Sequence, residues 1–94
     1  MMPYKYSRVK DTFYAEFEEE HYLLDITTAR YYVLSHEAAV VWLALDKPMS
    51  TRQLTTRLLD TEEGRDEEAT GRSIKRLIRQ FLALHLVEVN RRTS

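Results

Sequence analysis

The sequence predicts an α+β domain in which a three-stranded antiparallel sheet is followed by three helices, a winged helix-turn-helix-like arrangement. Two patterns predict it. Through the first third of the chain apolar residues alternate with polar ones, the period of a strand, and from Ser35 onward they recur at helical spacing. The length of 94 residues is enough for one domain with a single modest core.

The predicted strands occupy three stretches. In Thr12–Glu20 (TFYAEFEEE) every second residue from Phe13 to Phe17 is apolar, which is typical of a strand with one face in water. Two further runs, Tyr22–Ile26 and Tyr31–Leu34, flank four mostly polar residues, the pattern of a β-hairpin. A hairpin alone is marginal in water, so we expect the helices to cover its inner face.

Each predicted helix begins at a capping residue. Ser35 and Asp66 precede first turns that contain glutamates, which the helix dipole favours, and Ser50 forms a Ser-x-x-Gln capping box with Gln53. Behind each cap, apolar residues repeat at the spacing of one helical face. The predicted core positions are Ala38, Val41, Trp42 and Leu45, then Leu54 and Leu58, and then Ile74, Leu77, Ile78, Phe81 and Leu82.

The two ends of the chain are expected to add little to this core. Residues 4–9 (YKYSRV) extend the first strand or add to it, and Leu86–Val89 (LVEV) form a short strand or an extended tail. We expect a single domain over residues 1–94, in which residues 1–10 and 90–94 are loosely ordered.

Composition favours a cytoplasmic protein that does not contact a membrane. The chain has no cysteine, which fits a reducing compartment. Its longest uninterrupted apolar run, Ala38–Leu45, has eight residues and is far too short to cross a bilayer. The first ten residues, MMPYKYSRVK, lack the continuous apolar stretch of a signal peptide.

No group of residues assembles an active site. The histidines lie in different predicted elements, without a cysteine or a His-x-x-x-His pair, which argues against a metal site. Gly64 and Gly71 stand alone, so there is no glycine-rich phosphate loop, and no nucleophile motif surrounds a serine. The consecutive acids Glu18–Glu20 are typical of a solvated turn. The sequence therefore predicts a protein that is not an enzyme and uses no metal or cofactor.

A basic surface on the third helix gives one candidate function. Arg72, Arg76 and Arg79 project from the helix face opposite its apolar stripe, and in a helix-turn-helix such a helix enters the DNA major groove. However, the preceding loop is acidic and the net charge is −1, whereas DNA-binding domains usually carry a clear positive excess. A winged-helix DNA-binding protein is therefore the alternative, and nucleic acid the less favoured partner.

The second candidate surface combines a strand edge with a helix. The apolar stripe of the third helix spans about 160°, so either both its margins are buried or one lines a groove. The margin with Ile78 and Leu82 is bordered by Lys75 and Arg79, an apolar floor with a basic rim. The stretch Tyr31–Leu34 has no charge or proline to block an exposed edge, and such an edge beside a groove invites an added peptide strand.

These residues resemble a known family. LLDITTARYYVLSHEAAVVWLALDKPMSTRQLTTRLL, followed by DEEATGRSIKRLIRQFLALHLVEV, resembles the PqqD-like proteins, also called RiPP recognition elements. The most similar members are the stand-alone leader-peptide-binding proteins of lasso-peptide biosynthesis. The resemblance covers about Phe13 to Val89. Where Ala29 and His85 stand, members of the family usually have glycine, so we expect slightly strained or rearranged turns at these two positions.

The resemblance implies a non-catalytic peptide chaperone. Such proteins bind the leader of a ribosomally made precursor as an extra strand between the third strand and the third helix. They then deliver it to a leader peptidase and to a macrolactam-forming cyclase. Carried over by position, the peptide-binding residues are Tyr31, Tyr32, Val33 and Leu34 at the edge, Ile78 and Leu82 in the floor, Lys75 and Arg79 toward leader acids, and Asp25 as the residue that orients a base.

Overall fold

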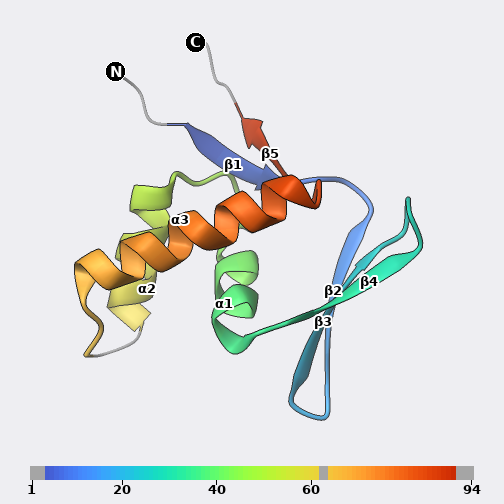
Figure 1. Cartoon of the computed structure of the whole chain (residues 1–94), viewed down its shortest axis with the longest axis horizontal. Helices are drawn as coiled ribbons and strands as arrows, with labels where there is room; N and C mark the ends of the chain where they lie inside the picture. The colour runs from blue at the N-terminus through green and yellow to red at the C-terminus, as the bar shows by residue number, and fades with distance from the viewer. Residues whose placement is uncertain (1–3, 62–63, 91–94) are drawn as a thin grey trace.

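The computed structural model describes residues 4–61 and 64–90 and confirms the predicted α+β class. Along the chain the elements are β1 (Lys5–Arg8), β2 (Thr12–Phe17), β3 (Glu20–Asp25), β4 (Arg30–Leu34), α1 (His36–Ala44), α2 (Thr51–Thr61), α3 (Glu67–Ala83) and β5 (Val87–Asn90). The strands β2, β3 and β4 form the predicted antiparallel sheet, in that order, and the predicted helices follow it (Figure 1).

The prediction that residues 4–9 belong to the first sheet strand is wrong. Lys5–Arg8 form β1, which pairs antiparallel with β5 in a second, two-stranded sheet, with Lys5 opposite Asn90 and Arg8 opposite Val87. Part of the segment expected to be loosely ordered is therefore a strand. Residues 1–3 and 91–94, also named in that expectation, lie outside the described residues.

All three predicted helix caps are present. The Ser35 Oγ accepts a hydrogen bond from the Ala38 N–H at 3.1 Å, and the Asp66 carboxylate accepts one from the Ala69 N–H at 2.8 Å. The predicted capping box closes in both directions: the Gln53 N–H donates to the Ser50 Oγ, and the Ser50 N–H donates to Gln53 Oε1. These side chains satisfy backbone donors that have no partner within the helix.

The core lies mainly between the helices, and Leu23 of the three-stranded sheet belongs to it, with Tyr14, Tyr32 and Leu34 packed against it. Trp42 of α1 packs edge-on against Phe81 of α3, with ring centroids 5.6 Å apart. The Arg8 guanidinium lies over the Trp42 ring and donates to its backbone carbonyl at 2.7 Å. Burial lowers the pKa of Arg8, although Asp46 acts in the opposite direction. From the sheet, Leu23 is fully buried in this core, and Tyr32 packs against it.

The alternation in β2 suggested Phe13 and Phe17 as its buried side, but the structure has the opposite arrangement. Tyr14 packs against the core, whereas Phe13 and Phe17 are 56% and 64% exposed. Figure 1 shows the helices on one side of the sheet, and the β2–β3 turn extends beyond them. No described element covers the other side of the sheet. The helices do cover the inner face of the hairpin at Leu23 and Tyr32, as predicted.

Candidate functional site

The strand β4 has an open edge. Among the described residues its only strand partner is β3, because β4 ends the sheet. The direction of its backbone groups follows from one hydrogen bond: the Ile26 N–H donates to the Asp11 carbonyl at 3.0 Å, on the β2 side. In an antiparallel strand the side of bonding alternates, so Leu24 also bonds toward β2, and Leu23 and Asp25 bond toward β4.

The same alternation identifies the free donors on β4. Its residues opposite Leu23 and Asp25 bond to β3, so the N–H and C=O groups of Tyr31 and Val33 point away from the sheet. The side chains of Tyr31 and Val33 are 68% and 58% exposed. Two donors and two acceptors of the main chain are therefore available to an added strand.

A hollow of about 430 Å³ adjoins the start of this edge. Arg30 and Tyr32 of β4 form one wall, and Leu84 at the end of α3 belongs to the other. The remaining lining residues are Val9, Lys10, Asp25, Thr27, Thr28, Ala83 and His85. We call this the β4–α3 hollow. It lies between the start of β4 and the end of α3.

Asp25, predicted to orient a base, is buried at the base of this hollow and is 7% exposed. Its Oδ1 accepts a hydrogen bond from the Thr27 N–H at 3.0 Å. This local bond stabilises the turn between β3 and β4, since Asp side chains often bond the backbone two residues on. Asp25 therefore stabilises this turn, and its role in orienting a base stays a prediction.

The four residues predicted on α3 are not brought together at the β4 edge. Ile78 is 3% exposed and belongs to the core, and Leu82 is half-buried against it. Lys75 lines a different hollow, on the side of α3 that faces α2. Arg79 is exposed and lies about 40° from Lys75 around the helix, so it shares that side.

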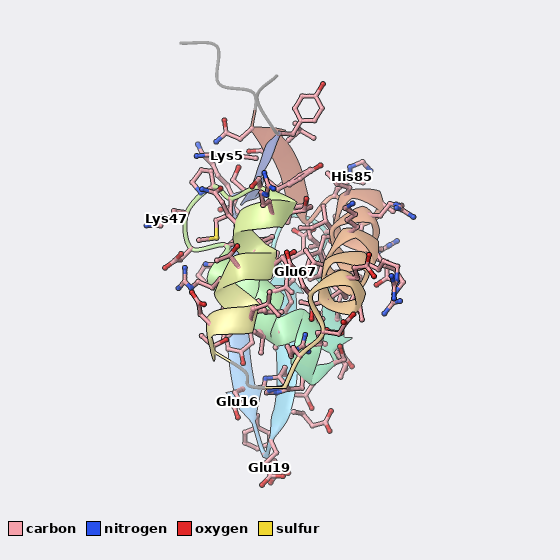
Figure 2. All side chains as sticks on the ribbon, turned by 90° about the vertical axis from the view of Figure 1, so that its left-hand side faces the viewer. Lys5, Glu16, Glu19, Lys47, Glu67 and His85 are labelled. Atoms are coloured by element: carbon pink, nitrogen blue, oxygen red, sulfur yellow. The ribbon has the colours of Figure 1, made fainter. Side chains whose placement is uncertain are left out.

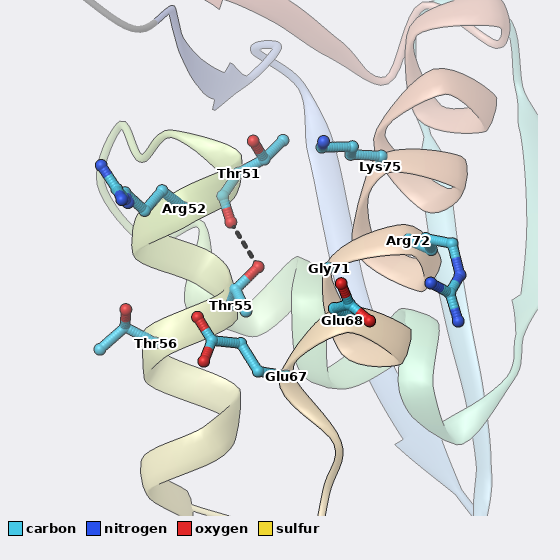
Figure 3. A pocket seen from close by; sticks show the side chains of 9 residues that line it. All are labelled: Thr51, Arg52, Thr55, Thr56, Glu67, Glu68, Gly71, Arg72 and Lys75. Atoms are coloured by element: carbon cyan, nitrogen blue, oxygen red, sulfur yellow. Dashed lines mark hydrogen bonds between the residues drawn. The ribbon is translucent and has the colours of Figure 1, made fainter.

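The α2–α3 hollow, of about 500 Å³, is the one in which Lys75 points toward Thr51 (Figure 3). Residues of both signs line it: the bases Arg52, Arg72 and Lys75, and the acids Glu67 and Glu68. The acids leave an excess of only one positive charge, which is small for a surface that binds a phosphate backbone and weakens the DNA alternative.

The margin of α3 that does face β4 is the opposite one. Leu84 lines the β4–α3 hollow with Tyr32, and Leu77 lies two turns earlier on the same helix side. Sequence reasoning also missed Lys10 and Arg30 at this site. Both leucines belong to the wide apolar stripe, but a stripe alone does not say which of its margins faces the sheet.

The uncovered side of the sheet forms a second surface, which we call the outer face. The register places Phe13, Leu24 and Tyr31 side by side across the sheet, with Ala15, Tyr22 and Val33 in the next row. Four of these side chains, and that of Phe17 in the following row, are between 41% and 68% exposed. The four are Phe13, Leu24, Tyr31 and Val33. Together they expose on the order of 500 Å² of largely apolar surface, which is the usual size of the largest apolar patch on a monomer, and such a patch is often functional.

An acidic hairpin tip borders the outer face. Glu18 and Glu19 form the turn between β2 and β3, both with positive φ, and Glu20 follows them. Figure 2 shows Glu19 at one end of the molecule and His85 toward the other. The acidic tip and the β4–α3 hollow thus lie at opposite ends of the sheet.

Two other kinds of site were sought. Within residues 4–61 and 64–90, no group of three or more His, Cys, Asp or Glu side chains could hold a metal ion. The helices in the same ranges are all too short or too polar to cross a membrane.

Two solved structures have a similar fold. One is TbiB1 in complex with the TbiA(beta) leader peptide, at 17% sequence identity and a TM-score of 0.75, and it covers 92% of this chain and 99% of its own. The other is lasso peptide synthetase B1 complexed with the leader peptide, at 19% identity and a TM-score of 0.73 over 88% of this chain and 96% of its own. No protein-family model and no curated protein sequence matches the chain. The predicted resemblance is thus confirmed in the fold.

Proposed function

We propose that this protein is a non-catalytic, cytoplasmic peptide chaperone that binds the leader of a ribosomally made precursor as an additional strand on β4. The observation that carries the proposal is the open edge: Tyr31 and Val33 direct two N–H and two C=O groups away from the sheet. The two solved structures described above each contain a leader peptide, which supports the same use of the fold here.

Strand addition divides affinity and specificity between backbone and side chains. Each main-chain hydrogen bond contributes about 0.5–1.5 kcal/mol net, so four bonds supply a moderate, sequence-independent affinity. Alternate side chains of the leader would face inward, toward Tyr32 and the β4–α3 hollow, where Leu84 offers an apolar wall. That wall replaces the floor expected from Ile78 and Leu82, whose side chains are largely taken up by the core.

The outer face is proposed as the surface that presents the bound leader to processing enzymes, a leader peptidase and a macrolactam-forming cyclase. It lies on the same strand as the leader edge but projects perpendicular to it, so a peptide and an enzyme could occupy β4 together. Its exposed phenylalanines would be covered in such a complex. The largest apolar patch of a monomeric protein is often a functional surface, which supports this role.

The test compares two variants of Val33. One loses the backbone N–H at the strand edge, and the control keeps the N–H but has a smaller side chain. Val33→Pro deletes the N–H that faces the added strand, and edge strands tolerate proline. Val33→Ala keeps the N–H and shortens the side chain. Fluorescence anisotropy with a labelled leader, taken from the precursor encoded beside this chain's gene, should show a loss of about 5- to 10-fold for Val33→Pro. Val33→Ala should stay within about twofold.

Two results would contradict the proposal. Equal leader affinity of Val33→Pro and the wild type, with both folded by circular dichroism, would mean that the edge is not used. Absence of leader binding by the wild type, together with salt-sensitive binding of a random DNA duplex, would favour the winged-helix alternative.

A further inference from the structure

Basic side chains gather where the open edge begins. Lys10, Arg30 and His85 all line the β4–α3 hollow, although they come from three separate segments of the chain. No ion pair is present for Lys10 or Arg30 among the described residues, and both side chains are exposed. The one carboxylate in the hollow is that of Asp25, which is buried and accepts the Thr27 N–H. The hollow therefore has two positive side chains, Lys10 and Arg30, and one negative side chain, Asp25, which is an excess of one positive charge.

The backbone at His85 is consistent with a role for its side chain. His85 has a φ of 61°, the left-handed conformation, at the position that follows α3. The Leu86 N–H bonds back to the Phe81 carbonyl at 2.9 Å, the pattern of a helix end at which glycine is the usual residue. A non-glycine residue there is strained, and strained residues of this kind are common at binding sites. The chain keeps an imidazole at the mouth of the hollow despite this strain.

Strand geometry specifies which leader position meets these groups. Tyr31 is the first β4 residue whose N–H and C=O face the added strand. The next leader residue toward the start of β4 lies opposite Arg30, and its side chain points to the same side of the sheet as those of Arg30 and Tyr32. That side is the one on which the hollow lies. A side chain at this leader position therefore enters a space with apolar walls and a cationic mouth.

We propose that the leader carries an acidic side chain at this position, and that Arg30 and Lys10, with His85 beside them, select for it. This inference rests on the proposed function and adds the chemical class of the peptide position at one end of the site. It also replaces Lys75 and Arg79, which lie toward α2, as the partners of a leader acid. The opposite possibility is a basic leader residue held by Asp25. It predicts that Arg30→Glu and Lys10→Glu would strengthen leader binding.

The experiment first reverses the charge of one basic residue of the hollow. It then reverses the charge of the leader residue, so that the two are again opposite in sign. Arg30→Glu and Lys10→Glu are titrated with the labelled wild-type leader, and Arg72→Glu, on the α2 side of α3, serves as the matched control. Each reversal at the hollow should weaken binding at least about fivefold in low salt and less in 0.5 M salt, because these groups are exposed to solvent. Arg72→Glu should bind within about twofold of the wild type. A leader whose acid is replaced by lysine should bind Arg30→Glu better than it binds the wild type.

The outcomes separate this inference from the proposed function. If the leader binds but Arg30→Glu and Lys10→Glu leave its affinity unchanged, the acid-selecting role is wrong and the strand-addition site stands. Tighter binding by Arg30→Glu, or a binding leader without an acid at that position, would equally overturn it. If the wild type does not bind the leader at all, the proposed function itself fails.

Discussion

Ala29 and His85 have φ values of 60° and 61°, at the two positions where the family resemblance led us to expect slightly strained or rearranged turns. The strain is confirmed. A left-handed conformation costs an ordinary L-residue about 1–2 kcal/mol, because its Cβ approaches the following carbonyl oxygen. Ala29 lies in the turn that joins β3 to β4, where its N–H donates to the Ile26 carbonyl at 3.3 Å. The turn therefore keeps its conformation although its sequence does not favour it.

Ala29→Gly should stabilise the protein. Glycine relieves the Cβ contact but adds freedom to the unfolded chain, so the net gain expected is about 0.5–1 kcal/mol. Urea unfolding followed by circular dichroism would show this gain as a higher midpoint at an unchanged slope. Ala29→Val, with a branched Cβ in the same conformation, should lower the midpoint. A destabilised Ala29→Gly would mean that the turn is not strained in solution.

At the scale of elements, the sheet and the helices are joined through few side chains. Leu23, in the central strand β3, is fully buried in the core formed by α1, α2 and α3. Its neighbour Leu24 points to the outer face and is 41% exposed. Successive residues of one strand thus have opposite environments, since side chains alternate between the two faces of a sheet. This makes the attachment of the sheet testable at two adjacent positions.

Leu23→Ala should destabilise the fold far more than Leu24→Ala. Removing a fully buried leucine costs about 2–5 kcal/mol through lost transfer energy and the cavity left behind. Removing the exposed leucine next to it should cost less than about 1 kcal/mol. Chemical unfolding of the two variants measures both values under one condition. Similar costs at the two positions would mean that the outer face is covered in solution.

For the molecule as a whole, local patterns predicted the elements, and long-range contacts decided the site. Period-two and helical spacing, with the caps at Ser35, Ser50 and Asp66, correctly predicted the three-stranded sheet and the helices. Pairing of β1 with β5 joins the two ends of the chain and has no local signal.

The orientation of surfaces could not be predicted in the same way. Both faces of β2 carry aromatic residues, so alternation alone did not reveal that Tyr14 faces the core and Phe13 faces out. Helical spacing gave the width of the stripe on α3, but its orientation depends on packing against α1 and α2. For that reason Leu84, rather than Lys75, lines the hollow beside β4.

The separation of the two surfaces on the sheet gives the prediction that concerns the whole molecule. If β4 holds the leader and the outer face docks the processing enzyme, a charge on the outer face should uncouple the two steps. Phe13 is suited to this test because it is 56% exposed and its side chain makes no contribution to the buried core. Phe13→Glu should bind the leader within about twofold of the wild type, since the β4 edge is unchanged.

Leader removal by the peptidase of the same pathway, measured by mass spectrometry with leader-bound protein, should fall at least about tenfold with Phe13→Glu. The reason is that docking would bury the new carboxylate in an apolar interface without a partner, which costs several kcal/mol. Leu43→Glu, at an exposed leucine of α1 away from the sheet, controls for a general effect of added charge. Normal processing by Phe13→Glu would exclude the outer face as the docking surface. Equal loss in both variants would point instead to a non-specific electrostatic effect, because only Phe13 lies on the outer face.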